Sequence, residues 1–182
     1  MKEEIMNQTN IKIGQLRDRM KELGIDAYLV PTADFHESEY VGEFFKCRHF
    51  LTGFNGTAGT AVITMDKAGL WTDGRYFIQA AQQLEEELPV DGCLGFDGRV
   101  VNSELGYGLQ NLLQEKNVTI NCSKDLVGEI WTSRPAMSCE PIWSLDVKYA
   151  GKSTVEKLSD LRDAMKKNKA QIHLMTALDE IA

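Results

Sequence analysis

The chain has 182 residues, of which 43% are hydrophobic and 26% are charged, and its formal net charge is −7. This balance is typical of a folded globular protein and excludes disordered, collagen-like and coiled-coil chains. No apolar run approaches the ~20 residues of a membrane span, and an acidic chain repels phosphate, so we expect neither a membrane nor a nucleic-acid partner.

The first half of the chain is predicted to alternate helices with strands. Ile13, Leu16, Met20 and Leu23 recur every three or four residues, which indicates an amphipathic helix that ends at Gly24. After it we expect a buried strand at 26–31, a short helix with loops at 35–50, a turn-rich loop at 53–59, and two hairpin strands at 60–64 and 69–72.

The second half continues this alternation, which predicts an α/β fold in which a mixed β-sheet is flanked by helices. The residues Ser153 and Glu156 form a capping box, which predicts the start of a helix. The other expected elements are a helix at about 75–88, strands at 93–96 and 118–121, a helix with leucines at 105, 109, 112 and 113, a connector at 132–151, and a strand at 172–175.

The last segment resembles the first. Residues 161–166 share Leu, Arg, Asp, Met and Lys with residues 16–21 in one register, and the same offset aligns Asp34 with Asp179. A lone helix and strand cannot bury their apolar faces, so we expect the chain to be cut from a longer protein, within a second domain. The predicted domains are therefore residues 1–150 and a truncated start of a second, similar domain at 151–182.

The passage from strand to helix at 71–77 (WTDGRYF) is the strongest candidate for a site. Ligands of α/β sheets favour the crevice beyond the strand ends, near helix N-termini. Asp73 suits an N-cap, and Arg75 then lies in the first turn, where the helix dipole disfavours a cation. Two interpretations remain open, an ion pair with Asp73 or another acid, and a guanidinium aimed at a carboxylate or carbonyl of a ligand. The spacing alone favours the ion pair.

Two other patterns give weaker indications. The loop 52–60 (TGFNGTAGT) invites comparison with a phosphate cradle, but no Gly-Lys-Ser/Thr follows it and it leads into a strand, which favours a tight structural turn over a nucleotide site. The segment 36–40 (HESEY) lacks the spacing of a zinc helix. The cysteines are widely and irregularly spaced, which predicts reduced thiols, at positions 47, 93, 122 and 139.

Two runs resemble a known family, the N-terminal creatinase-like domain of Xaa-Pro aminopeptidases (aminopeptidase P), which are pita-bread metallopeptidases. These runs are SEYVGEFFKCRHFLTGFNGTAGTAVI at 38–63 and GLWTDGRYFIQAA at 69–81. Segments at 126–136, 149–153 and 176–182 extend the likeness, which favours the three-domain enzymes. The chain departs from the family after Leu84, where relatives carry an additional stretch that includes a strand and a helix.

The resemblance implies a fold of the creatinase/prolidase N-terminal type, with a ribonuclease H-like motif. It also implies a parent enzyme that removes the first residue from peptides with proline in second place. Two divalent metals, usually manganese, would be held by a catalytic domain that this sequence does not contain. No catalytic residue and no metal ligand is therefore expected here. The implied substrate-binding residues are Arg75, Phe54, Phe50 and His36.

The expected function is therefore that of a non-catalytic N-terminal portion, which positions proline-containing peptides and contacts its own catalytic domain and a second subunit of a cytoplasmic homodimer. The polar N-terminus agrees with this, because it lacks the apolar region of a secretion signal. The alternative is a stand-alone creatinase-like binding or dimerisation module without peptidase activity. A nucleotide-binding α/β module is a third hypothesis, suggested by the glycine-rich loop.

Overall fold

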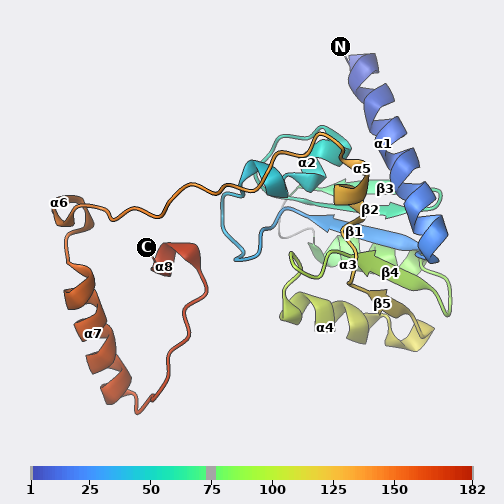
Figure 1. The fold of residues 1–182 in the computed structure, drawn as a ribbon. Coiled ribbons are helices and arrows are strands. Elements are labelled where there is room, and N and C mark those ends of the chain that lie inside the picture. Colours follow the sequence, from blue (N-terminus) through green and yellow to red (C-terminus); the bar gives the residue numbers. More distant parts are fainter. Residues whose placement is uncertain (1, 73–76, 182) are drawn as a thin grey trace. The chain divides into compact units, whose positions relative to one another are not determined.

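The computed structural model describes residues 2–72 and 77–181. The chain divides into two compact units, Met1–Met137 and Ser138–Ala182. Each unit is treated by itself, because their relative positions are not determined (Figure 1). Within the described residues, no helix combines the length and the apolar character that crossing a bilayer requires.

The first unit is built on a five-stranded sheet with the order β3-β2-β1-β4-β5. The central strand β1 is antiparallel to β2 and parallel to β4, β3 is antiparallel to β2, and β5 is parallel to β4. The predicted mixed sheet is thus confirmed. The strands are β1 (Ala27–Pro31), β2 (Thr60–Thr64), β3 (Ala68–Trp71), β4 (Cys93–Phe96) and β5 (Thr119–Asn121).

Helices cover both faces of this sheet (Figure 1). On one face lie α1 (Lys2–Leu23), α2 (Cys47–Thr52) and α5 (Leu126–Ile130), and on the other lie α3 (Phe77–Glu87) and α4 (Ser103–Leu112). Side chains alternate along a strand, so β1 supplies both cores. Tyr28 and Val30 pack with Leu16 and Met20 of α1, whereas Ala27 and Leu29 belong to the opposite cluster.

Tyr28 joins the central strand to the start of α5. Its hydroxyl donates to the carbonyl of Lys124 at 2.5 Å and accepts from the amide of Leu126 at 3.0 Å. Burial raises the pKa of this phenol well above its ordinary value, so it stays protonated and keeps its donor. The hydrogen bond to Leu126 is buried and the one to Lys124 is partly buried, and together they fix the start of α5 against the sheet.

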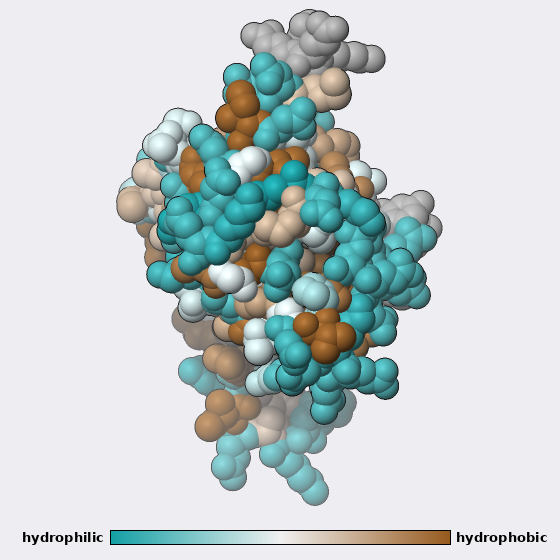
Figure 2. All heavy atoms as spheres, turned by 90° about the vertical axis from the view of Figure 1, so that its right-hand side faces the viewer, coloured by the Kyte–Doolittle hydropathy of each residue, from teal (hydrophilic) through white to brown (hydrophobic). Residues whose placement is uncertain are grey.

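Large apolar side chains are exposed in both units of the described chain, and more of them belong to Ser138–Ala182 than to Met1–Met137. The face turned to the viewer in Figure 2 is mainly hydrophilic, with hydrophobic side chains in small separate groups. Single exposed apolar side chains of this kind are common on folded domains.

Most predicted elements of the first unit are confirmed. The first helix ends at Leu23 and is followed by Gly24 with φ of 64°, as its pattern indicates. The predicted strands at 60–64 and 93–96 match β2 and β4 in their bounds. The region 35–50 holds a 3₁₀ turn at Glu43–Phe45 and the first part of α2. The helix expected from residue 75 is described from Phe77 to Glu87, and α5 was not predicted.

The second unit contains α6 (Val147–Ala150), α7 (Thr154–Lys167) and α8 (Leu178–Ile181). The predicted capping box is confirmed, since Ser153 and Glu156 bond each other's backbone amides at the start of α7. The strand predicted at 172–175 is wrong. No described strand pairs with it, and Ile172 and Leu174 are 86% and 80% exposed. An apolar alternation forms a strand only when a neighbouring strand satisfies its backbone.

Candidate functional site

One edge of the sheet gathers several segments that are distant in sequence. Because β1 and β2 are antiparallel, Pro31 at the end of β1 pairs with Thr60 at the start of β2. Thr60 also pairs with Trp71, the last residue of β3. The parallel strand β4 ends at this same edge, where α/β sheets commonly bind ligands.

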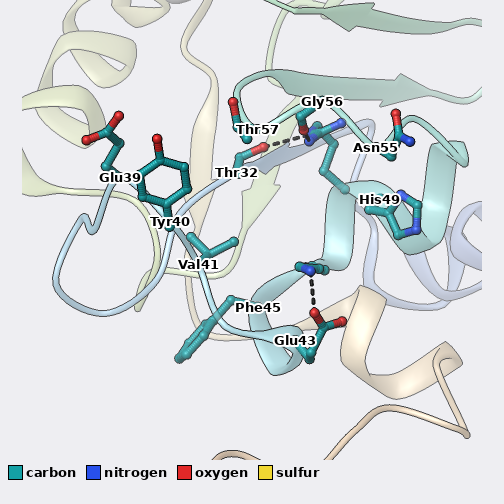
Figure 3. A pocket seen from close by; sticks show the side chains of 12 residues that line it. Thr32, Glu39, Tyr40, Val41, Glu43, Phe45, His49, Asn55, Gly56 and Thr57 are labelled. Carbon is teal, nitrogen blue, oxygen red and sulfur yellow. Dashed lines mark hydrogen bonds and ion pairs between the residues drawn. The ribbon is translucent and has the colours of Figure 1, made fainter.

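A cavity of about 330 Å³ opens at this edge (Figure 3). Its walls come from the end of β1, the loop 39–46, the start of α2 and the loop 53–59. Twelve residues line it, namely Thr32, Glu39, Tyr40, Val41, Glu43, Phe45, Lys46, Arg48, His49, Asn55, Gly56 and Thr57.

Arg48 ties these segments together. Its side chain is only 3% exposed. Nε donates to the hydroxyl of Thr32 at 2.6 Å, Nη1 donates to the carbonyl of Phe54 at 3.0 Å, and Nη2 donates to the carbonyl of Gly56. Burial lowers the pKa of this guanidinium below its ordinary value, because water no longer solvates the charge. One cation thus holds the loop 53–59 onto the end of β1.

The loop also bonds directly to the strand end. The amide of Thr32 donates to the carbonyl of Gly59 at 2.8 Å, and its hydroxyl donates to the same oxygen at 3.0 Å. Gly59 has φ of 150°, and a Cβ there would lie 2.7 Å from the carbonyl oxygen of Trp71 and 3.5 Å from Cδ of Arg48. The expected tight turn with close backbone approach is therefore confirmed, and only glycine fits at this point.

A second turn shapes the opposite wall. Asp34 is 6% exposed and accepts from the amides of His36 at 2.9 Å and Ser38 at 3.0 Å. Burial by itself would raise the pKa of this carboxyl, but the two amides favour its charged form and hold the pKa below the ordinary value. This turn directs the chain toward Glu39 and Tyr40, which line the cavity.

His49 lies at the cavity with a defined ring proton. Its Nδ1 is 3.0 Å from the carbonyl oxygen of Phe54. Because a carbonyl can only accept, Nδ1 carries the proton and donates. In the neutral form of the ring, Nε2 is then the nitrogen that can accept a hydrogen bond.

A cluster of charges beside α5 contacts Phe44 and Cys47, which flank residues that line the cavity. Nη1 of Arg134 donates to Asp125 at 2.5 Å, and Nε donates to the carbonyl of Phe44 at 2.8 Å. Its guanidinium carbon lies 3.7 Å from the centre of the Phe44 ring. Nη2 of Arg134 contacts the sulfur of Cys47 at 3.3 Å. Burial, and then the charge of Asp125, raise the pKa of the Cys47 thiol to about 12, so it stays protonated.

The residues proposed from the sequence are only partly brought together. Phe54 is not among the residues that line the cavity, but its ring centre lies 5.1 Å from the guanidinium carbon of Arg48, which does line it. His36 is exposed on the loop that leads to the cavity. Phe50 does not line the cavity, because its ring stacks on Trp131 at 4.6 Å and under Lys12 at 4.3 Å. Arg75 and its possible partner Asp73 lie outside the described residues.

Sequence reasoning missed Arg48. The available signal was an arginine in the short helix CRHFLT. The glycine-rich loop that follows this helix has backbone carbonyls that no regular secondary structure uses. The described parts of the chain contain no group of three His, Cys, Asp or Glu side chains that could hold a metal ion. The metal centre that the family resemblance implies therefore does not fit these residues.

Comparison with known proteins identifies close relatives of this architecture. Residues 12–99 and 133–182 each match a model described as the creatinase/prolidase N-terminal domain. A "Probable Xaa-Pro aminopeptidase P" of Coprinopsis cinerea is 39% identical over 96% of this chain and 32% of its own length. "Aminopeptidase P1" of Arabidopsis thaliana is 38% identical over 87% of this chain and 28% of its own length. The chain thus spans about a third of the length of these relatives.

The alignment with the Coprinopsis relative covers 197 positions, more than the 182 residues of this chain, so that relative carries residues that this chain lacks. Among solved structures, an X-prolyl aminopeptidase from Caenorhabditis elegans, described as a cytosolic enzyme with a di-nuclear active site, matches with a TM-score of 0.74 and 30% identity, over 88% of this chain and 32% of that one. An Xaa-Pro aminopeptidase from Streptococcus pyogenes matches with a TM-score of 0.50 and 24% identity, over 69% and 98%, and shows the fold alone.

The close approach at Gly59 gives a matched prediction. Gly59→Ala forces a Cβ against the Trp71 carbonyl and should lower the free energy of unfolding by about 1–3 kcal/mol. Gly14→Ala, in α1, meets nothing within 4 Å and should raise it by about 1 kcal/mol, because alanine favours a helix. Urea denaturation measures both, and equal effects of the two substitutions would contradict the packing described for Gly59.

Proposed function

Because the chain belongs to the creatinase/prolidase N-terminal domain family, we propose that it is the N-terminal part of an Xaa-Pro aminopeptidase. Such an enzyme releases the first residue of peptides whose second residue is proline. The observation that carries this proposal is the identity of 36–39% with aminopeptidases P over most of the chain. The TM-score of 0.74 to an X-prolyl aminopeptidase supports it independently.

In this proposal the chain positions the peptide and other residues hydrolyse it. The two metal ions of the enzyme, manganese in our proposal, would be held elsewhere, since the described residues offer no ligand set. The second match at 133–182 and the division after Met137 support a second, similar domain at the end of the chain, although both begin before residue 151. We also propose that the chain contacts the catalytic domain, that the enzyme is a homodimer and that it is cytoplasmic.

Arg75 is the proposed contact with the substrate main chain or carboxylate. Support comes from the family motif at 71–77 and from β3, which ends beside Thr60 at the edge that holds the cavity. Phe54 and His36, near the same edge, are proposed as further peptide contacts. Phe50 would contribute through the packing of α2, since its ring is engaged by Trp131 and Lys12.

The direct test is peptide hydrolysis. The complete gene product, supplied with manganese, is expected to release the first residue of Ala-Pro-Ala and not that of Ala-Ala-Ala. The 182-residue chain alone is expected to release neither. Free alanine is measured by mass spectrometry. If the complete product shows no activity, the chain is better described as a binding or dimerisation module, and metal-dependent hydrolysis by the 182-residue chain would contradict its non-catalytic role.

Substitution of Arg75 separates its two interpretations. In the complete enzyme, Arg75→Ala should raise KM about 10-fold or more with kcat nearly unchanged, because a charged hydrogen bond contributes roughly 1.5–3 kcal/mol to binding. The melting temperature should stay the same. Arg162→Ala, on an exposed position of α7, is the control and should change neither value. An unchanged KM together with a large drop in melting temperature would favour a structural ion pair of Arg75.

A further inference from the structure

The cavity is lined by a buried positive charge, Arg48, that none of the described residues neutralises. The three hydrogen bonds of the Arg48 guanidinium all go to uncharged oxygens, those of Thr32, Phe54 and Gly56. A guanidinium has five N–H donors, so these bonds do not use its full capacity. Within the part of the chain that the structure describes, no carboxylate forms an ion pair with Arg48. An anion that enters the cavity would therefore meet a cation with no carboxylate partner among the described residues.

The other charges at the cavity leave this feature intact. Lys46 forms an ion pair with Glu43, so these two cancel. Glu39 is exposed, where water screens its charge. His49 and Asn55 also line the cavity and can form hydrogen bonds with a ligand. The bonds described above use neither Nε2 of His49 nor the side-chain amide of Asn55.

The cavity has two chemically different sides. In Figure 3 the polar side chains of Thr32, Thr57 and Asn55 lie along one side, and Tyr40, Val41 and Phe45 lie along another, with Glu39 next to Tyr40 and Glu43 near Phe45. The volume of about 330 Å³ falls within the range of small-ligand sites. Such a site fits a small ligand, no longer than a few residues, in which a carboxylate lies next to apolar groups.

We infer that this cavity binds the C-terminal end of a short peptide, with its carboxylate at Arg48 and its apolar side chains against Tyr40, Val41 and Phe45. This inference rests on the proposed function for the choice of a peptide as the ligand. It adds a binding site for the carboxyl end of the peptide, and the residue that would bind this end, Arg48, was not identified from the sequence.

The test is a titration of the isotopically labelled 182-residue chain, followed by NMR. The probes are Ala-Pro-Ala, the same tripeptide with an amidated C-terminus, and acetate. Ala-Pro-Ala with its free carboxylate should shift the Nε–H resonance of Arg48 and the backbone amide resonances of residues 55–57. The amidated tripeptide should bind at least 10-fold more weakly. Equal affinity of acid and amide, or shifts confined to other regions, would overturn the inference. Acetate binding as tight as that of the tripeptide would overturn the choice of a peptide.

Two variants guard against loss of the fold. Arg48→Lys removes the guanidinium but can also loosen the loop 53–59. The second variant is therefore Tyr40→Ala, because Tyr40 is 73% exposed and lines the cavity without holding the loop. It should weaken the acid tripeptide several-fold without a change in melting temperature. Tyr107→Ala, 66% exposed on α4, is the matched control and should leave affinity unchanged. Equal affinities of the two tyrosine variants would count against the site.

The inference and the proposed function fail in different ways. Hydrolysis of Xaa-Pro peptides by the complete gene product, without carboxylate-dependent binding at this cavity, would overturn the inference alone. Carboxylate-dependent binding without any hydrolysis by the complete product would overturn the proposed function alone.

Discussion

A single buried guanidinium organises the candidate site. Arg48 reaches the hydroxyl of Thr32 after β1 and the carbonyls of Phe54 and Gly56 in the loop before β2. Hydrogen bonds to a charged group contribute roughly 1.5–3 kcal/mol each, and carbonyls left unpaired by its loss would incur a penalty of comparable size. A lysine has the charge but not the planar fork, so it cannot serve three acceptors in this arrangement. The loop, and with it the cavity wall, depends on this residue.

The sheet topology explains why such an arrangement forms at this edge. The antiparallel pairing of β1 with β2 brings Thr32 beside Gly59, although they are far apart in the chain. The turn at Asp34 then leads away from β1 and forms the facing wall. A cavity with one polar and one aromatic side follows from two loops of different composition meeting at one strand end. The proposed peptide-binding role uses this geometry.

Local patterns in the sequence predicted much of the fold. The β-branched run TAVIT became β2, and the stripe that includes Leu16 and Met20 became the buried side of α1. The alternation at 172–175 failed, because a strand depends on a partner and its neighbourhood in the sequence cannot supply one. The short helix α5 escaped notice although Asp125 caps it through the amide of Gly128 at 2.7 Å. Five residues are too few for a helical period to stand out.

The site was harder to predict than the fold. The glycine-rich loop was expected to be a tight turn, and the contact of Gly59 with the Trp71 carbonyl confirms this. The role of Arg48 depends on which carbonyls meet it in space, and its place before the glycine-rich loop does not specify them. Phe50 and Phe54 are close in sequence, yet one packs on Trp131 and the other on Arg48. Residues on one short helix and its following loop can thus belong to different environments.

Amide hydrogen exchange in Arg48→Lys tests most directly whether this guanidinium holds the loop. The amides of Thr32 and Phe54, which bond to the Gly59 carbonyl and the Thr52 hydroxyl, should exchange at least 10-fold faster than in the unmodified chain. The amide of Leu105, bonded to Asn102 at the start of α4, should be unchanged. Unaltered protection of Thr32 and Phe54 would contradict the central role assigned to Arg48.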